Sequence, residues 1–237
     1  MLKIEHLTKR YGAKAAVDDL SLHIKPGEIY GFIGHNGAGK TTTIKSCCGI
    51  LAFDEGEITV NGVSIRRDPI ACKKMMAYIP DNPDLYEFLS GVKYLNFVAD
   101  MYGVGKAERE ERIARYADLF ELTEDLAQPV SAYSHGMKQK LALISALIHE
   151  PKLVIMDEPF VGLDPKASHI VKGLMRDICD AGGAIFFSTH VLEVAEKLCD
   201  RVAIIRQGRL VANGTLEEVS GDASLEEVFL ELEGDNA

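Results

Sequence analysis

The stretch Gly34-His35-Asn36-Gly37-Ala38-Gly39-Lys40-Thr41 decides the fold of this 237-residue chain. It fits the pattern G-x-x-x-x-G-K-[ST], in which glycines let backbone N–H groups converge on phosphate oxygens. An apolar run over residues 28–33 precedes it, and the spacing predicts a helix over 40–51 behind it. A chance match somewhere in the chain has odds of about one in a hundred. We interpret the stretch as a nucleotide phosphate loop, with Lys40 reaching the β- and γ-phosphates and Thr41 able to ligate Mg²⁺.

The first 79 residues, on either side of this loop, are predicted to form mostly strands. Apolar and polar residues alternate over 2–7 and 16–24, and Pro26-Gly27 marks a turn before the run 28–33. Asn61-Gly62 is the strongest two-residue hairpin signal, and it separates predicted strands 57–60 and 63–65. A further strand is predicted over 75–79, where Pro80 ends it.

The second half of the chain changes character twice. Charged and apolar residues at helical spacing across 108–119 indicate a helical insert. After Pro129, strands predicted over 153–156, 184–188 and 201–206 alternate with helices over 166–181 and 191–199. This βαβ order implies a parallel sheet with helical crossovers. Gly208 turns the chain into 209–211, and short acidic helices are expected at 216–219 and 224–232.

Two carboxylates follow the buried strand 153–156, namely Asp157 and Glu158. Sites gather at the carboxyl ends of parallel strands, so both acids are expected beside the phosphate loop. Asp157 would hold Mg²⁺ through water, and Glu158 would polarise an attacking water as a base. The alternative is that they cap the next helix, but Pro159 and a further loop before Pro165 make immediate capping a poor explanation.

Three other positions carry weaker signals. Ser134 is a good N-cap for an apolar helix over 141–149, but a capped core helix does not explain why Gly136 lies in the first turn. His190 follows the strand 184–188 and could simply begin a helix. Tyr11 lies after the first strand and could be ordinary surface packing. Taken alone, each pattern is also compatible with an ordinary structural role of the residue.

Composition limits the partners and the compartment. The chain carries 26 Lys and Arg against 36 Asp and Glu, and a net charge of −10 opposes a role in coating nucleic acid. No apolar stretch approaches the roughly 18 residues of a membrane-spanning helix, and 47% hydrophobic residues exclude wholesale disorder. Five cysteines without metal-ligand spacing are expected to be reduced and mostly buried thiols. The first residues show no secretory signal, which predicts the cytoplasm.

Taken together, these motifs resemble the ATP-binding-cassette ATPases, specifically the ATP-binding subunits of bacterial ABC transporters of the exporter-like type. Residues 34–42, which include Thr42, are similar to the family's phosphate loop, and 133–137 to its signature loop. Residues 153–158 resemble its second nucleotide motif with the general base, and 161–164 its dimer-communication loop. His190 lies where the family has its switch histidine, and Tyr11 where an aromatic ring stacks on adenine.

The chain departs from the family pattern in two places. The usual signature is Leu-Ser-Gly-Gly-Gln, whereas this chain has Tyr133, His135 and Met137 at three of these positions and keeps Ser134 and Gly136. The lid glutamine expected after the strand 75–79 is missing. Asp81 is our candidate replacement as a Mg²⁺ ligand, and a simple turn is the alternative.

The resemblance implies an α/β fold with a phosphate-loop core, a mixed and largely parallel sheet, an N-terminal antiparallel β subdomain and a helical insert. We expect the core over 1–90 and 129–214, the insert over 91–128, and a C-terminal helical extension over 215–237. It also implies that two copies, or a copy and a related subunit, sandwich two ATP molecules, with Ser134 and Gly136 facing the phosphate loop of the other copy. Membrane-spanning permease subunits would then anchor the protein on the inner face of the cell membrane.

The resemblance also implies where the permease docks. The transmission surface resembles residues 83–101, of which Leu85, Tyr86, Phe88 and Leu89 are unusually apolar for a loop. Internal packing against the insert is the alternative.

Rival functions belong to other classes. A soluble ABC-type ATPase acting on nucleic acid or ribosomes is possible, but the charge and the single cassette oppose it. A nucleotide kinase would not need Ser134 or His190, and a non-hydrolysing regulatory module would be expected to lack Glu158. The transported substrate is not encoded in these motifs.

Overall fold

Two β-sheets meet around the helix that follows the phosphate loop. In this computed structural model, which describes residues 1–221 and 223–234, the smaller sheet has the order β2-β1-β4-β5 and is antiparallel. Its strands are β1 (Leu2–Tyr11), β2 (Lys14–Ile24), β4 (Glu55–Val60) and β5 (Val63–Ser64). This sheet is the predicted antiparallel β subdomain.

The larger sheet has the order β10-β9-β3-β8-β7-β6. Five of its strands are parallel, and β10 pairs antiparallel with β9, so the sheet is mixed as predicted. These strands are β3 (Ile29–Ile33), β6 (Met76–Ile79), β7 (Leu153–Asp157), β8 (Ala184–Thr189), β9 (Arg201–Arg206) and β10 (Arg209–Thr215). Every residue of β3, β7 and β8 is buried, which explains why these segments are continuous apolar runs rather than alternating ones.

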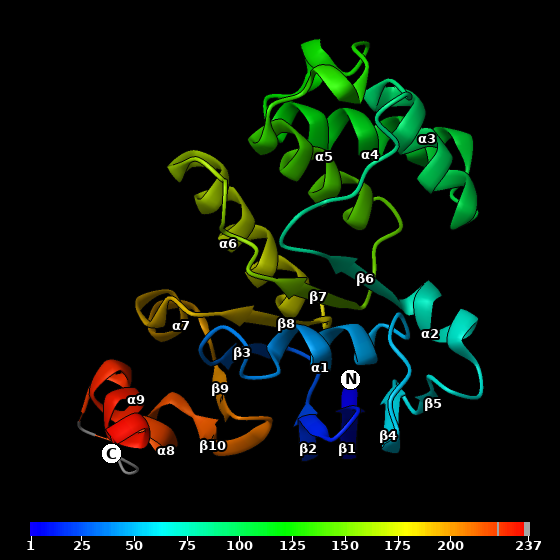
Figure 1. Ribbon diagram of the computed structural model, residues 1–237. Helices are drawn as coiled ribbons and strands as arrows, with labels where there is room; N and C mark the ends of the chain where they lie inside the picture. The colour runs from blue at the N-terminus through cyan, green and yellow to red at the C-terminus, as the bar shows by residue number, and fades with distance from the viewer. Residues whose placement is uncertain (222, 235–237) are drawn as a thin grey trace.

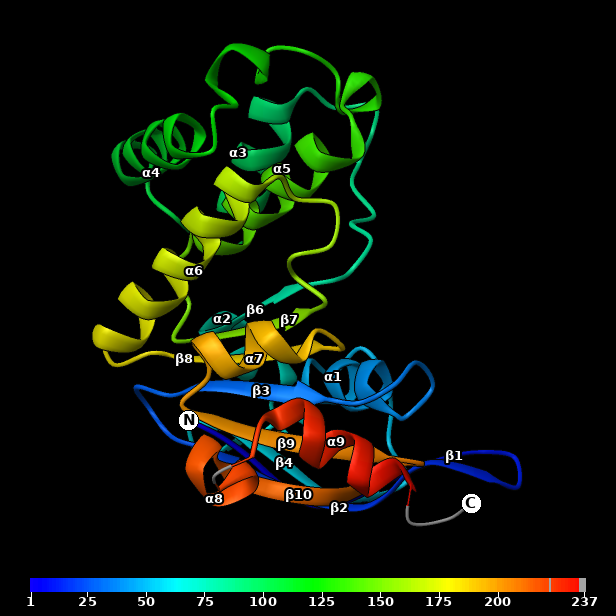
Figure 2. The same cartoon turned by 90° about the vertical axis from the view of Figure 1, so that its left-hand side faces the viewer.

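The helices divide between the sheets and a separate lobe (Figures 1 and 2). Helix α1 (Lys40–Cys47) lies in the core between the two sheets, with Ile44 and Cys47 fully buried. The lobe contains α3 (Gly91–Met101), α4 (Lys106–Leu119), short 3₁₀ turns over Thr123–Asp125 and Val130–Ala132, and α5 (His135–Leu147). Around the larger sheet lie α2 (Pro69–Met75), α6 (Pro165–Asp180), α7 (Leu192–Leu198), α8 (Leu216–Ser220) and α9 (Leu225–Gly234).

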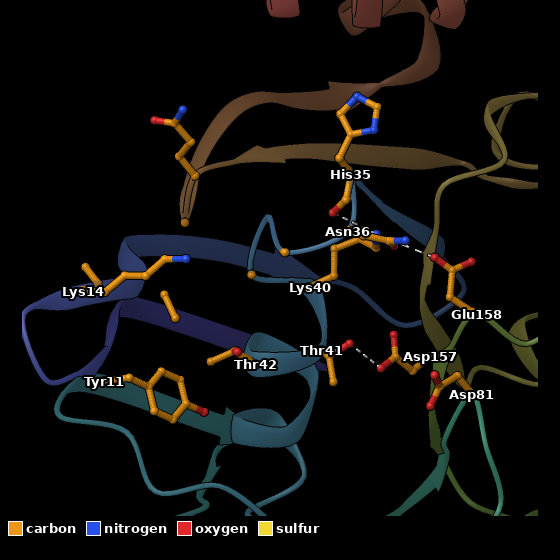
Figure 3. Close-up of a pocket in the computed structure, with 16 residues that line it drawn as sticks. Tyr11, Lys14, His35, Asn36, Lys40, Thr41, Thr42, Asp81, Asp157 and Glu158 are labelled. Atoms are coloured by element: carbon orange, nitrogen blue, oxygen red, sulfur yellow. Dashed lines mark hydrogen bonds and ion pairs between the residues drawn. The ribbon is translucent and has the colours of Figure 1, made fainter.

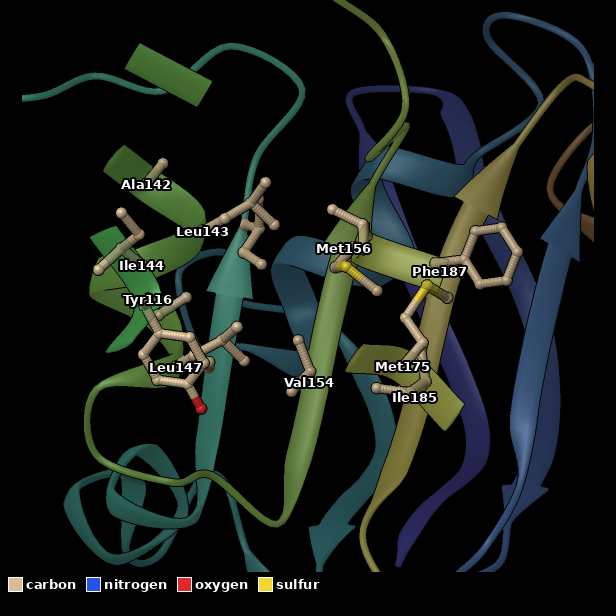
Figure 4. Packing of buried hydrophobic residues seen from close by; sticks show 14 of the residues in the cluster. Tyr116, Ala142, Leu143, Ile144, Leu147, Val154, Met156, Met175, Ile185 and Phe187 are labelled. Atoms are coloured by element: carbon tan, nitrogen blue, oxygen red, sulfur yellow. The ribbon is translucent and has the colours of Figure 1, made fainter. Parts of the chain in front are cut away.

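The lobe packs onto the larger sheet through one continuous apolar cluster (Figure 4). Leu143 and Leu147 of α5 lie on the same side of the sheet as Val154 and Met156 of β7. Met175 of α6 extends the cluster toward β8. Burying such side chains contributes about 1.5–3 kcal/mol each, so this cluster holds the lobe against the strand that ends in Asp157.

Element boundaries differ from the predictions where local capping residues set the ends of helices. The helix predicted over 40–51 ends at Cys47, because Gly49 adopts a left-handed conformation with φ of +61° just beyond its C-cap. Helix α2 was missed, although Asp68 caps it by accepting a bond from the Ala71 N–H at 3.0 Å and Pro69 is its first residue. Met75, predicted to begin a strand, is the last residue of this helix.

The domain limits stay a prediction. Helix α5 begins at His135, beyond the predicted insert 91–128, yet it packs against both α3 and α4. In the C-terminal extension predicted over 215–237, positions 222 and 235–237 lie outside the described residues. All five cysteines are free and buried, as the composition predicts. Among the described residues, no helix is long and apolar enough to cross a membrane.

Candidate functional site

A cavity of about 670 Å³ lies at the carboxyl ends of β3 and β7 (Figure 3). It brings together residues that are far apart in sequence and that come from both sheets. Its lining residues are Tyr11, Lys14, Ala15, Ala16, His35, Asn36, Gly37, Gly39, Lys40, Thr41, Thr42, Asp81, Asp157, Glu158, Gln207 and Gly208. Most residues predicted to bind nucleotide or metal therefore lie in one cavity.

The phosphate loop joins β3 to α1 and needs glycine for two different reasons. A Cβ atom on Gly34 would lie 2.5 Å from the backbone oxygen of Ile205, so only glycine fits against β9. Gly37 has φ of +83° and meets nothing within 4 Å where its Cβ would be. Its backbone is therefore open to the cavity, as a loop that offers N–H groups to phosphate requires.

The ammonium group of Lys40 lies beneath this loop and is almost completely buried. It donates to the carbonyl oxygen of Gly34 at 2.5 Å and to that of His35 at 3.3 Å. Oε1 of Glu158 lies 3.6 Å away. These contacts hold the Lys40 ammonium group in place at the wall of the cavity that a polyphosphate would enter.

Asp157, at the end of β7, receives two hydroxyl hydrogen bonds. Thr41 Oγ1 donates to Oδ2 at 2.7 Å, and Ser188 Oγ of the neighbouring β8 donates to Oδ1 at 2.5 Å. Asp157 is 2% exposed, so these bonds offset much of the cost of burying its carboxylate. Sequence reasoning assigned Thr41 and Asp157 to Mg²⁺ but missed Ser188, because no motif marks a serine inside an apolar strand.

Glu158 has a left-handed backbone, with φ of +49°, directly after β7. Its N–H donates to both the hydroxyl and the carbonyl oxygen of Ser188, at 3.1 and 3.2 Å. These bonds offset the backbone strain of a non-glycine residue in this region, which is about 1–3 kcal/mol. Nδ1 of His190 lies 3.0 Å from Oε1 of Glu158. The carboxylate is therefore placed between His190 and Lys40, although His190 itself does not line the cavity.

The opposite end of the cavity contains residues that sequence reasoning missed. Lys14 projects into it from the start of β2, and Gln207 and Gly208 come from the β9–β10 turn. Gly208 N–H donates to the carbonyl oxygen of Ala38 at 2.9 Å, so this turn also supports the phosphate loop. Tyr11 is half exposed here, as an aromatic platform for a base would be. Only the three-dimensional proximity of these turns could have revealed them.

Ser134 and Gly136 lie elsewhere, at the start of α5 in the helical lobe. The Ser134 hydroxyl accepts the N–H of Met137 at 3.2 Å and caps the helix. A Cβ on Gly162 would lie 2.6 Å from the ring of His135, so the two loops are in close contact. Lys140 and Asp164 add an ion pair of 3.0 Å between the same elements. The hydrogen bond from the Ala167 N–H and the contact with Lys140 hold the pKa of Asp164 below its usual value.

Asp81 lies next to Asp157 at the edge of the cavity (Figure 3). Its Oδ1 also accepts the N–H of Asn82 at 2.9 Å, which is a turn contact. The position is compatible with a metal-directed role and with a turn role, so the assignment of Asp81 as a ligand stays a prediction.

A family model described as "ABC transporter" matches residues 17–161, which include the phosphate loop and the cavity acids Asp81, Asp157 and Glu158. The chain belongs to the ABC transporter family. The ABC-type transporter ATP-binding protein EcsA of Bacillus subtilis is 36% identical over 242 residues, covering all of this chain and 98% of that protein. The linearmycin resistance ATP-binding protein LnrL of the same organism is 37% identical over 215 residues, which are 91% of this chain and 69% of LnrL.

Solved structures agree with this ABC assignment. An ATP-binding subunit of an ABC transporter is 37% identical and has a TM-score of 0.95, over 98% of this chain and 99% of the other. The ATP-binding cassette MJ0796, solved as a dimer with ADP and phosphate, has a TM-score of 0.82 and is 21% identical, over 91% of this chain and 98% of that one. The similarity to MJ0796 supports the assignment of the fold. The chain is an ATP-binding and ATP-hydrolysing subunit of an ABC transporter, and the soluble alternative is not favoured.

The ABC site fits both a nucleotide and a magnesium ion. The loop offers backbone N–H groups and a buried ammonium to phosphate, and Tyr11 and Lys14 line the same cavity. The Thr41 hydroxyl and the Asp157 carboxylate are hard oxygen donors that already lie 2.7 Å apart. Since Mg²⁺ prefers few protein ligands and keeps several waters, this pair is a sufficient set.

Proposed function

We propose that two copies of this subunit enclose Mg-ATP between them and drive permease subunits in the membrane. The observation that carries the proposal is the separation of the predicted site. Lys40, Thr41, Asp157 and Glu158 share one cavity, whereas Ser134 lies on the helical lobe and outside the lining of that cavity. A second chain is the simplest way to bring a Ser134 loop to the open side of the cavity.

The main residues of the predicted site each have a role in this proposal. Lys40 binds the β- and γ-phosphates, and Thr41 with Asp157 would hold Mg²⁺, which offsets phosphate charge when bound. Glu158 accepts a proton from the attacking water, and His190 orients Glu158 through their 3.0 Å contact. Tyr11 stacks on the base. The loop N–H groups of residues 34–42 fix the triphosphate so that its terminal phosphorus faces Glu158.

Mixing two defective chains tests whether the site is shared. A Ser134→Arg chain lacks a working lobe contact, and a Lys40→Ala chain lacks a working phosphate loop. In a mixed dimer, one composite site carries both defects and the other carries neither. ATP turnover should therefore return to a substantial fraction of wild type, although each variant alone is inactive. Mixed dimers that form but stay inactive would contradict a shared site.

An exposed aromatic patch supports docking of the permease near the lobe. Phe88 is 81% exposed and Tyr86 51%, and their rings lie 5.9 Å apart. Phe97 and Met101 of α3 extend the patch on the same side, with the Phe97 ring 5.5 Å from that of Tyr86. Leu85 is buried in the core, so only part of the apolar segment is free for a partner. Exposed aromatic side chains in such a cluster are typical of protein interfaces.

Charge substitution in this patch tests the docking. Phe88→Glu should abolish co-purification with co-expressed permease subunits and release the chain from membranes, because a carboxylate would be buried in the contact. Its high exposure predicts that the isolated chain still folds and binds ATP. Ile70→Glu, on exposed α2, is the matched control and should keep the complex intact. Wild-type co-purification of Phe88→Glu would exclude this surface.

A further inference from the structure

The phosphate loop contacts the C-terminal helix through one pair of rings. The imidazole of His35 meets the ring of Phe229 on α9, with centroids 5.0 Å apart and an interplanar angle of 63°. Phe229 is 8% exposed, so the contact is buried on the side of α9. In Figure 3 the His35 ring points away from Thr41 and Asp157. The ring of His35 thus contacts α9 on the side of the loop away from Thr41 and Asp157.

Helix α9 is firmly attached to the rest of the protein. Leu225 is completely buried, and its N–H donates to Oε1 of Glu196 on α7 at 2.5 Å. The Arg206 guanidinium at the end of β9 donates to the carbonyl oxygen of Leu232. Both ends of the helix are thus fixed to elements of the larger sheet and its covering helix. A ring on such a helix can hold a loop in place.

His35 is the residue through which this contact reaches the phosphate site. Its carbonyl oxygen accepts the N–H of Ala38 at 3.1 Å and the ammonium of Lys40 at 3.3 Å. Rotation of the His35 peptide would break both bonds. The glycines at 34, 37 and 39 have no side chains, so they cannot anchor the loop as the His35 ring does.

We propose that Phe229 is a positioning residue for ATP binding, which fixes the His35 peptide and so holds the phosphate loop in the shape that receives the triphosphate. A loop that is ordered before binding loses less conformational entropy when ATP arrives. The C-terminal helix therefore contributes to nucleotide affinity without touching nucleotide. None of the motifs that carry the family resemblance includes this helix.

A double-mutant cycle on the full chain tests this role. Phe229→Ala and His35→Ala should each raise the Kd for ATP by about 3- to 10-fold, the size expected for one lost aromatic pair. The double variant should be no weaker than the weaker single variant, because both remove the same contact. Phe229→Tyr should keep the wild-type Kd. Fluorescence titration with an ATP analogue measures all four.

A structural role alone makes different predictions. It would lower the melting temperature of Phe229→Ala and leave the Kd of the folded protein unchanged, and that result would overturn the proposal. So would fold-changes in Kd that multiply in the double variant. Leu230→Ala, a 60% exposed position on the same helix, is the control and should change neither quantity. Lys40→Ala tests the ATP site itself, since loss of binding there is expected whether or not Phe229 acts on the loop.

Discussion

Lys40 and Glu158 face each other across the floor of the nucleotide cavity, with Nζ 3.6 Å from Oε1. Both groups are largely shielded from solvent, so each charge is partly balanced by the other. A γ-phosphate entering between them would compete with Glu158 for the ammonium group. The base is therefore held next to the place where phosphate charge arrives, which is where an attacking water must be polarised.

Glu158→Gln should lower ATP turnover by at least about 100-fold and leave the Kd for ATP equal or lower. The amide removes the proton acceptor and the negative charge beside the phosphate, but it spares the loop and Lys40. The variant should accumulate as an ATP-bound dimer on size-exclusion chromatography. Glu193→Gln on exposed α7 is the control with wild-type turnover expected. Normal hydrolysis by Glu158→Gln would refute the base assignment.

Ser188→Ala should lower both the free energy of unfolding and the affinity for Mg²⁺. The Ser188 hydroxyl donates to Asp157 and accepts the N–H of Glu158, so its loss affects both residues. Removing it leaves a buried carboxylate with one hydroxyl donor fewer, at a cost of about 1–3 kcal/mol in the free energy of unfolding. The Mg²⁺ concentration needed for half-maximal hydrolysis should rise. Denaturant titration and a Mg²⁺ series measure the two effects. An unchanged Mg²⁺ series would show that Ser188 acts on stability alone.

Asp81→Ala should raise the Mg²⁺ concentration required for hydrolysis if Asp81 replaces the missing lid glutamine, and Asp81→Gln should retain much of the activity. A carboxylate beside Asp157 favours binding of a cation and repels a phosphate group that has no Mg²⁺ bound to it. Asp84→Ala, an exposed neighbour in the same loop, is the control. A wild-type Mg²⁺ series for Asp81→Ala would leave the turn bond to Asn82 as the role of this residue.

Gly162→Ala should lower the free energy of unfolding by about 1–3 kcal/mol, because φ is +80° and the new methyl would meet the His135 ring. Adding His135→Ala removes the ring and so the clash, but not the backbone strain, so the double variant should recover part of the loss. Gly173→Ala in the middle of α6 meets nothing within 4 Å and should instead stabilise by up to about 1 kcal/mol. Equal stability of Gly162→Ala and its double variant would show that the two loops do not press on each other.

The sequence revealed those parts of the site whose residues are adjacent in the chain. The loop from Gly34 to Thr41 and the pair Asp157-Glu158 are each strand ends with their own local pattern, and both line the cavity. Lys14, Gln207 and Ser188 were missed because each lies in an ordinary turn or strand and reaches the site only through sheet order. Helix α2 was missed for a different reason: its seven residues are too few for periodicity to stand out.

The helical lobe is inserted between β6 and β7, and this placement has a mechanical consequence. The chain leaves the sheet two residues before Asp81 and returns through the strand that ends in Asp157. Beyond Glu158, Gly162 lies against the ring of His135 at the start of α5. The lobe is thus connected to the cavity acids in two ways: through the chain at Asp81 and Asp157, and through the contact between Gly162 and His135. If the lobe swings when a permease docks, as the proposed function requires, the movement would reach Asp81 and Asp157 along both connections at once.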